Sequence, residues 1–209
     1  MKLIIVRHGE TVENVKNLSQ GHIDGTLTDN GQNQVRKLGE RLKDAKIDFI
    51  YCSDLGRTKD TLKEIIRFHP HIPVIYNDLL RERSKGIFEG KPKEVLTKVR
   101  ERAGGTRFEY RPEGGENFPD VRARVKAFID FLFLRHADSE TILLCTHGGW
   151  KNSFMSYLLN MPFEETVQRF NFKNASVTTL NLKRDGKYLL HLVNCTKHLD
   201  GEVGVETCE

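Results

Sequence analysis

Short apolar runs that alternate with amphipathic segments constrain the fold of this chain more than any other feature. The runs are rich in β-branched and other bulky apolar side chains, as expected for strands buried in a sheet. They cover residues 3–6, 49–52, 74–76 and 141–145. Between the runs, apolar residues recur every three or four positions, which is typical of helices that pack on a sheet. The alternation predicts a three-layer α/β/α sandwich with a mostly parallel central sheet, in one domain spanning residues 1–209.

The helices and the remaining elements can also be placed. Helices are expected to start at Thr28 and Asp29 and after Ser53 and Asp54, which can cap the second of them. Further helices are expected at residues 91–103, at residues 118–133 and up to Leu159. The stretch 12–26 reads as a polar loop, and the glycine-rich stretch 104–116 as the longest loop. Val177–Leu182 and residues 188–193, on either side of an Arg-Asp-Gly turn, predict a hairpin.

Composition excludes several classes of protein. Hydrophobic residues make up 38% of the chain and charged residues 30%, which is ordinary for a globular protein. The formal charge is +4, and the cations are scattered among acids, so we expect a small anionic ligand rather than a nucleic acid. No apolar run is long enough for a signal peptide or a membrane span. The four cysteines, Cys52, Cys145, Cys195 and Cys208, show no CxxC spacing, which favours a reducing, cytoplasmic setting.

Two of the predicted strands end in histidine followed by glycine. The first continues into Arg7-His8-Gly9 and the fourth into Thr146-His147-Gly148. Ligands of open α/β sheets bind beyond the carboxyl ends of the strands, so both imidazoles are expected at one edge, within reach of each other. The first stretch taken alone is equally compatible with a structural role, with Arg7 exposed and His8 capping the strand.

Further charged residues follow other predicted elements. Arg57 lies in the first turn of a helix, where free N–H groups also attract anions. Two guanidinium groups, two imidazoles and a helix start suit a doubly charged phosphate. Glu82 follows Leu79 and Leu80 at the expected end of another sheet element, where a carboxyl group could exchange protons with a leaving oxygen or water. The sequence contains no G-x-x-x-x-G-K-[ST], G-x-G-x-x-G or G-x-S-x-G motif.

Several blocks in the same order resemble the histidine phosphatase superfamily, whose fold is that of phosphoglycerate mutase. They cover nearly the whole chain and are Arg7-His8-Gly9-Glu10-Thr11, Asn14, Gln20-Gly21, Leu27-Thr28 with Gly31, Ser53-Asp54-Leu55-x-Arg57-Thr58, Leu80-Arg81-Glu82, Phe88-Glu89-Gly90, Gly114-Gly115-Glu116 and Thr146-His147-Gly148.

The resemblance implies a role for each matching residue. His8 corresponds to the nucleophile that forms a phosphohistidine, and Glu82 to the general acid and base. Arg7, Arg57 and His147 correspond to the groups that hold the phosphoryl oxygens. The matching motifs also place Asn14, Gln20, Gly21 and Gly148 at the substrate. The family needs no metal or other cofactor, because the arginines supply the positive charge.

Hydrolase and mutase are both found in this superfamily. Cofactor-dependent phosphoglycerate mutases typically carry Trp and Asn where this chain has Glu13 and Gly149, and they have paired arginines in a longer middle segment. The chain is more similar to TIGAR-like fructose-2,6-bisphosphatases, while broad-specificity and phosphoserine phosphatases match its length. We therefore expect a phosphatase of small metabolites, with a mutase as the alternative. A binding module without chemistry is the third alternative.

A second group of cations follows Glu82. Arg83, Lys85 and Lys91 are candidates for binding a second anionic group, as in a sugar bisphosphate or a phosphoglycerate. The alternative is that they are solvated surface cations. We expect this small phosphorylated metabolite to be the ligand, with no nucleic-acid or membrane partner. The protein is expected to be a monomer or a homodimer.

Overall fold

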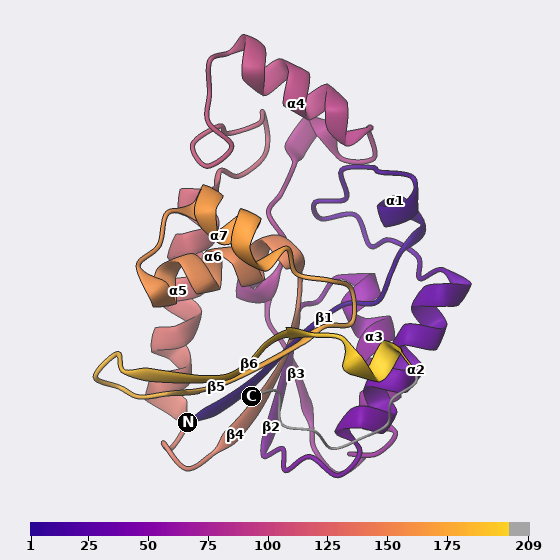
Figure 1. Cartoon of the computed structure of the whole chain (residues 1–209), viewed down its shortest axis with the longest axis vertical. Coiled ribbons are helices and arrows are strands. Elements are labelled where there is room, and N and C mark those ends of the chain that lie inside the picture. Colours follow the sequence, from indigo (N-terminus) through magenta and orange to yellow (C-terminus); the bar gives the residue numbers. More distant parts are fainter. Residues whose placement is uncertain (201–209) are drawn as a thin grey trace.

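The strands form one mixed sheet in the computed structural model, which describes residues 1–200 (Figure 1). The strand order is β3-β2-β4-β1-β5-β6. The strands are β1 (Lys2–Arg7), β2 (Phe49–Cys52), β3 (Val74–Tyr76), β4 (Thr141–Thr146), β5 (Val177–Leu182) and β6 (Tyr188–Cys195). The first four run parallel, and β5 and β6 are antiparallel to their neighbours, which confirms the mostly parallel sheet and the terminal hairpin.

Helices cover both faces of the sheet, so the predicted three-layer sandwich is confirmed (Figure 1). The helices are α1 (Val12–Val15), α2 (Asp29–Leu42), α3 (Gly56–Ile66), α4 (Lys93–Arg102), α5 (Phe118–Arg135), α6 (Gly148–Leu159) and α7 (Phe163–Phe170). Three short 3₁₀ helices are η1 (Asp78–Leu80), η2 (Gly86–Phe88) and η3 (Lys197–Leu199). In Figure 1, α4 stands apart from the sheet at the top of the molecule.

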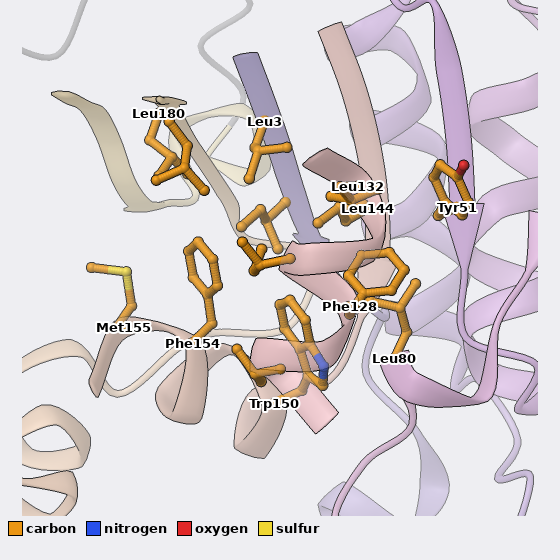
Figure 2. Packing of buried hydrophobic residues seen from close by; sticks show 14 of the residues in the cluster. Leu3, Tyr51, Leu80, Phe128, Leu132, Leu144, Trp150, Phe154, Met155 and Leu180 are labelled. Atoms are coloured by element: carbon orange, nitrogen blue, oxygen red, sulfur yellow. The ribbon is translucent and has the colours of Figure 1, made fainter. Parts of the chain in front are cut away.

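Alternating side chains of β1 build a separate core on each face of the sheet, because successive residues of a strand point to opposite sides. Leu3 and Ile5 belong to the cluster under α5 and α6. Ile4 and Val6 belong to the cluster under α2 and α3. Figure 2 shows the first cluster, where Trp150 and Phe154 of α6 face the sheet. A strand that is buried on both faces holds its carboxyl end firmly for the residues that follow it.

The helix cap agrees with the prediction at α2 and differs from it at α3. Thr28 caps α2 as predicted, because its hydroxyl accepts a hydrogen bond from the N–H of Gly31 at 2.9 Å. The predicted cap of α3 by Ser53 and Asp54 is wrong, since Leu55 precedes that helix without a side-chain cap. The two polar side chains bind elsewhere: Ser53 contacts His147 and Asp54 pairs with Arg81.

Three short elements also differ from expectation. The polar loop 12–26 begins with the one-turn helix α1. Helix α7 was not predicted, although Phe163, Val167 and Phe170 recur at helical spacing and pack on the core. Leu79 and Leu80 do not end a strand but lie in η1, where the Asn77 side chain accepts a hydrogen bond from the N–H of Leu79. Elements of three or four residues, such as α1 and η1, are too short for a hydrophobic period to reveal them.

The remaining expectations concern cysteines and membranes. Cys52 and Cys145 are buried core thiols and face each other in the register of β2 and β4. Cys208 lies outside the described residues. Within residues 1–200, no helix combines the length and the apolar character that crossing a membrane requires.

Candidate active site

The register of β1 and β4 brings the two His-Gly motifs together. Arg7 pairs with Thr146, so the next residues along both strands are His8 and His147. Their ring centroids lie 5.3 Å apart with the ring planes inclined by 56°. Both side chains are buried, with exposed fractions of 2% and 0%. The expected meeting of the two imidazoles at one sheet edge is confirmed.

The hydrogen bonds of His8 select one tautomer. Its Nδ1 lies 2.7 Å from the carbonyl oxygen of Gly9. A carbonyl only accepts, so Nδ1 carries the hydrogen and Nε2 keeps a lone pair. Burial, with the charges of Arg57 and Arg7, lowers the pKa of His8 well below its ordinary value. Near neutral pH this ring is therefore uncharged, with the lone pair of Nε2 available for bonding.

The backbone around His8 is held by two residues that sequence reasoning missed. Asn174 donates through Nδ2 to the carbonyls of His8 and Gly9 and to Oδ1 of Asn14, each at 3.1 Å. Thr61 accepts from the N–H of Gly9 at 2.9 Å. Both residues lie far from His8 in the sequence, so no local pattern could have pointed to them.

Arg57 joins a loop to the second histidine. Its Nε donates to Nδ1 of His147 at 3.2 Å, and its Nη2 donates to the carbonyl of Gly21 at 2.9 Å. Its Nη1 donates to the carbonyls of Ile23 and Asp24. A guanidinium group has five N–H donors, so within the described residues one N–H of Nη2 is left for a ligand.

His147 lies behind the cavity wall rather than on it. Burial, followed by the charge of Arg57, lowers its pKa well below the ordinary value, so the ring is neutral. Since Nδ1 accepts from Arg57, Nε2 carries the hydrogen and donates to Oγ of Ser53 at 2.8 Å. Both ring nitrogens are thus bound to protein groups in this structure. A contact between His147 and a phosphoryl oxygen, which the resemblance implies, would have to replace one of these bonds.

Arg7 approaches the start of α6 closely. Its Nη1 donates to the carbonyl of Phe172 at 2.5 Å, while its buried Nε has no partner among the described residues. A Cβ atom on Gly148 would lie 3.3 Å from Cζ of Arg7, so a glycine leaves room for the guanidinium group.

Glu82 faces the start of the same helix. Its Oε2 accepts from the N–H of Gly149 at 2.9 Å and its Oε1 from the N–H of Arg83 at 2.8 Å. A Cβ atom on Gly149 would lie only 2.0 Å from Oε1. Burial alone would raise the pKa of this carboxyl, but the charge of Lys85 and the two N–H donors outweigh burial and lower it. Glu82 is therefore ionised near neutral pH when the site holds no anion.

The expected site residues surround one cavity of about 910 Å³, with His147 and Lys91 as the exceptions. The predicted residues on its wall are Arg7, His8, Asn14, Gln20, Gly21, Arg57, Glu82, Arg83, Lys85 and Gly148. Asn14 is held by Asn174, and Gln20 donates to the hydroxyl of Thr11. Residues at or after the ends of all four parallel strands therefore meet at the carboxyl edge of the sheet.

The sequence profile of the "Histidine phosphatase superfamily (branch 1)" matches residues 3–195 of this chain. The chain belongs to the histidine phosphatase superfamily. It is a phosphatase of that superfamily, in agreement with the resemblance that its motifs carry.

Individual relatives differ in their described activities. A probable phosphoglycerate mutase, GpmB of Yersinia enterocolitica, is 31% identical over 96% of this chain and 95% of its own. The fructose-2,6-bisphosphatase TIGAR B of Danio rerio is 40% identical over 64% of this chain, and the match covers 53% of that relative. Among solved structures, Bacillus stearothermophilus YhfR superposes with a TM-score of 0.85 at 30% identity, over 95% of this chain and 98% of its own.

Several cations line the cavity of this histidine phosphatase. Arg83 and Lys85 lie on its wall as predicted, but Lys91 does not, because its ammonium group lies over the Phe88 ring instead. Three further cations come from α4 and the loop that follows it, and they were not predicted: Lys93, Arg100 and Arg107. The acidic residues on the wall, within the described part of the chain, are Glu82, Glu101 and Glu164.

These cations repel one another in partly desolvated surroundings. Burial and the neighbouring Arg83 lower the pKa of Lys85 to about 7. Burial also lowers the pKa of Arg83 to about 10, and Nε of Arg83 has no partner within residues 1–200. A bound anion would relieve the repulsion between these cations.

His22 was given no role from the sequence, yet it lies beside Glu82. Its Nε2 lies 2.8 Å from the main-chain carbonyl oxygen of Glu82. The two residues are sixty positions apart, so only the folded structure reveals the contact.

Proposed function

We propose that this enzyme hydrolyses phosphomonoesters of small metabolites through a phosphohistidine formed on His8. The observation that carries the proposal is the uncharged His8 ring, whose Nδ1 is tied to a carbonyl and whose Nε2 lone pair is free. This ring borders a cavity shared with Arg7, Arg57 and Glu82. A neutral nitrogen nucleophile beside two guanidinium groups fits phosphoryl transfer.

The reaction would proceed in two balanced steps. Nε2 of His8 forms a bond to phosphorus as the bond to the ester oxygen breaks, and Glu82 gives that oxygen a proton. Water then attacks the phosphohistidine, Glu82 takes up the proton of the water, and inorganic phosphate leaves with His8 restored. Arg7 and Arg57 stabilise the charge on the transferring oxygens, which is why we propose that no metal is required.

Glu82 needs a proton before the first step. Its lowered pKa leaves it ionised in the empty site. A phosphate dianion bound beside it raises the pKa of a carboxyl and compensates the charge of Lys85 and Arg57. We therefore propose that the proton enters with the substrate, whose monoanion passes it to Glu82 on binding.

A second candidate, phosphoglycerate mutase, is favoured by the relative GpmB. Gly149 argues against it, because mutases typically carry Asn there and a Cβ atom at this position would collide with Glu82. The deciding experiment uses 3-phosphoglycerate with a bisphosphate primer and excess EDTA. A hydrolase releases inorganic phosphate at an unchanged rate in EDTA. Rapid isomer exchange without release would identify a mutase, and loss of activity in EDTA would contradict a metal-independent reaction.

The substrate class that we propose carries a second anionic group, as a sugar bisphosphate or a phosphoglycerate does. Replacing Arg83 and Lys85 together by alanine is expected to raise KM for such substrates about tenfold or more, with KM for p-nitrophenyl phosphate nearly unchanged. The reason is that both cations lie on the cavity wall, where burial beside other cations lowers the pKa of each.

Steady-state kinetics of both substrates measures this effect. Lys91→Ala is the matched control, because it removes a nearby cation that is not on the cavity wall. An equal rise of KM for both substrates would show that the two cations do not recognise a second anion.

A further inference from the structure

We propose that His22 is a positioning residue for Glu82, which it aligns through a hydrogen bond to the main chain. The inference rests on the proposed role of Glu82 as general acid and base. His22 does not line the cavity, so it acts on the reaction only through the residue that it holds.

The hydrogen bond has a defined direction. Nε2 of His22 lies 2.8 Å from the carbonyl oxygen of Glu82. Because a carbonyl only accepts, Nε2 carries the hydrogen and donates it. The same oxygen accepts a longer bond from Nη2 of Arg124 at 3.3 Å, so two side chains hold this one peptide group.

Glu82 needs such support because no regular element carries it. It follows the 3₁₀ helix η1 and lies in an irregular segment that continues to η2. Its carboxylate is bound by two N–H groups, one of which belongs to Arg83 in the same segment. A shift of this segment would therefore move the carboxylate and one of its two donors together.

His22 also connects Glu82 to the loop that holds Arg57. The carbonyls of its two neighbours, Gly21 and Ile23, accept hydrogen bonds from the Arg57 guanidinium group. Glu89 supports the same junction, since its Oε1 accepts from the N–H groups of His22 and Lys85 at 2.9 Å each. One loop thus sets the position of a phosphate-binding arginine and, through His22, the position of the acid.

The test exploits the different needs of two leaving groups. An alkyl phosphate such as β-glycerol phosphate needs a proton on its leaving oxygen, whereas p-nitrophenolate leaves readily without one. His22→Ala is expected to lower kcat/KM for the alkyl ester about tenfold or more and kcat/KM for p-nitrophenyl phosphate less than about threefold. His22→Gln, whose amide N–H reaches about as far as Nε2, is expected to restore most of the loss.

Further variants make each outcome decisive. His22→Asn retains a polar side chain that is too short to reach the carbonyl of Glu82. It is expected to show the same kinetic losses as His22→Ala, and it keeps the test usable if the alanine variant folds poorly. The exposed His71→Ala serves as the matched control. Equal losses for both esters, or an asparagine variant as active as the wild type, would overturn the positioning role.

Glu82→Gln separates this inference from the proposed function. If this substitution lowers kcat/KM equally for both esters, Glu82 is not the general acid and the proposed function is wrong. If it lowers kcat/KM selectively for the alkyl ester and the His22 variants do not, only the role of His22 is wrong.

Discussion

Replacing His8 by alanine is expected to lower kcat for every phosphomonoester by about 10⁴-fold or more, because the covalent route disappears with its nucleophile. The site around the missing ring should persist. The backbone at this position is held by Asn174 and Thr61, and neither contact involves the imidazole. Steady-state kinetics with p-nitrophenyl phosphate, together with melting temperatures of both proteins, measures the effect.

Trapping of the intermediate provides a second readout for His8. Wild-type enzyme that is quenched during turnover of a ³²P-labelled ester should carry label that is stable in alkali and labile in acid, as phosphohistidine is. His8→Ala should carry none, and the exposed His191→Ala should be labelled like the wild type. Alkali-stable label on His8→Ala would show that His8 is not the nucleophile. A wild type without any activity would indicate a binding module.

Replacing Arg57 by alanine is expected to lower kcat/KM by about 10³-fold, since it removes a charge that stabilises the transferring phosphoryl group. Burial lowers the pKa of Arg57 to about 10, so the group is still charged near neutral pH. The variant also leaves the carbonyls of Gly21 and Ile23 without this donor, whereas the carbonyl of Asp24 keeps the main-chain N–H of residue 57. We therefore expect a lower melting temperature in addition to the kinetic effect.

Arg57→Lys distinguishes the two contributions of this side chain. A lysine keeps the positive charge but cannot reproduce a fork that binds His147 and three carbonyls together. It is expected to recover only part of the lost kcat/KM, with KM and kcat measured separately. A lysine variant with full activity would mean that charge alone matters, and an alanine variant within about tenfold of the wild type would contradict a phosphate-binding role.

The strands were predictable because their residues carry information about their own surroundings. Leu3 and Ile5 are as apolar as Ile4 and Val6, and both sets are buried under helices on opposite faces of the sheet. A run without polar alternation therefore reveals a central strand. Helix α2 was predictable for a similar reason, with Thr28 as its cap. The short elements α1 and η1 contain too few residues for any period, whereas α7 was missed although Phe163, Val167 and Phe170 follow a helical spacing.

The sequence by itself determined the fold class, the two His-Gly motifs at strand ends and the family to which they belong. Only the tertiary structure decided how those motifs act, because hydrogen bonds between distant segments do not leave a local pattern. The register of Arg7 with Thr146 brings the imidazoles together, and a carbonyl contact selects the nucleophilic tautomer of His8. The supports from Asn174 and His22, and the cations Arg100 and Arg107 on the cavity wall, likewise follow from chain segments meeting in space.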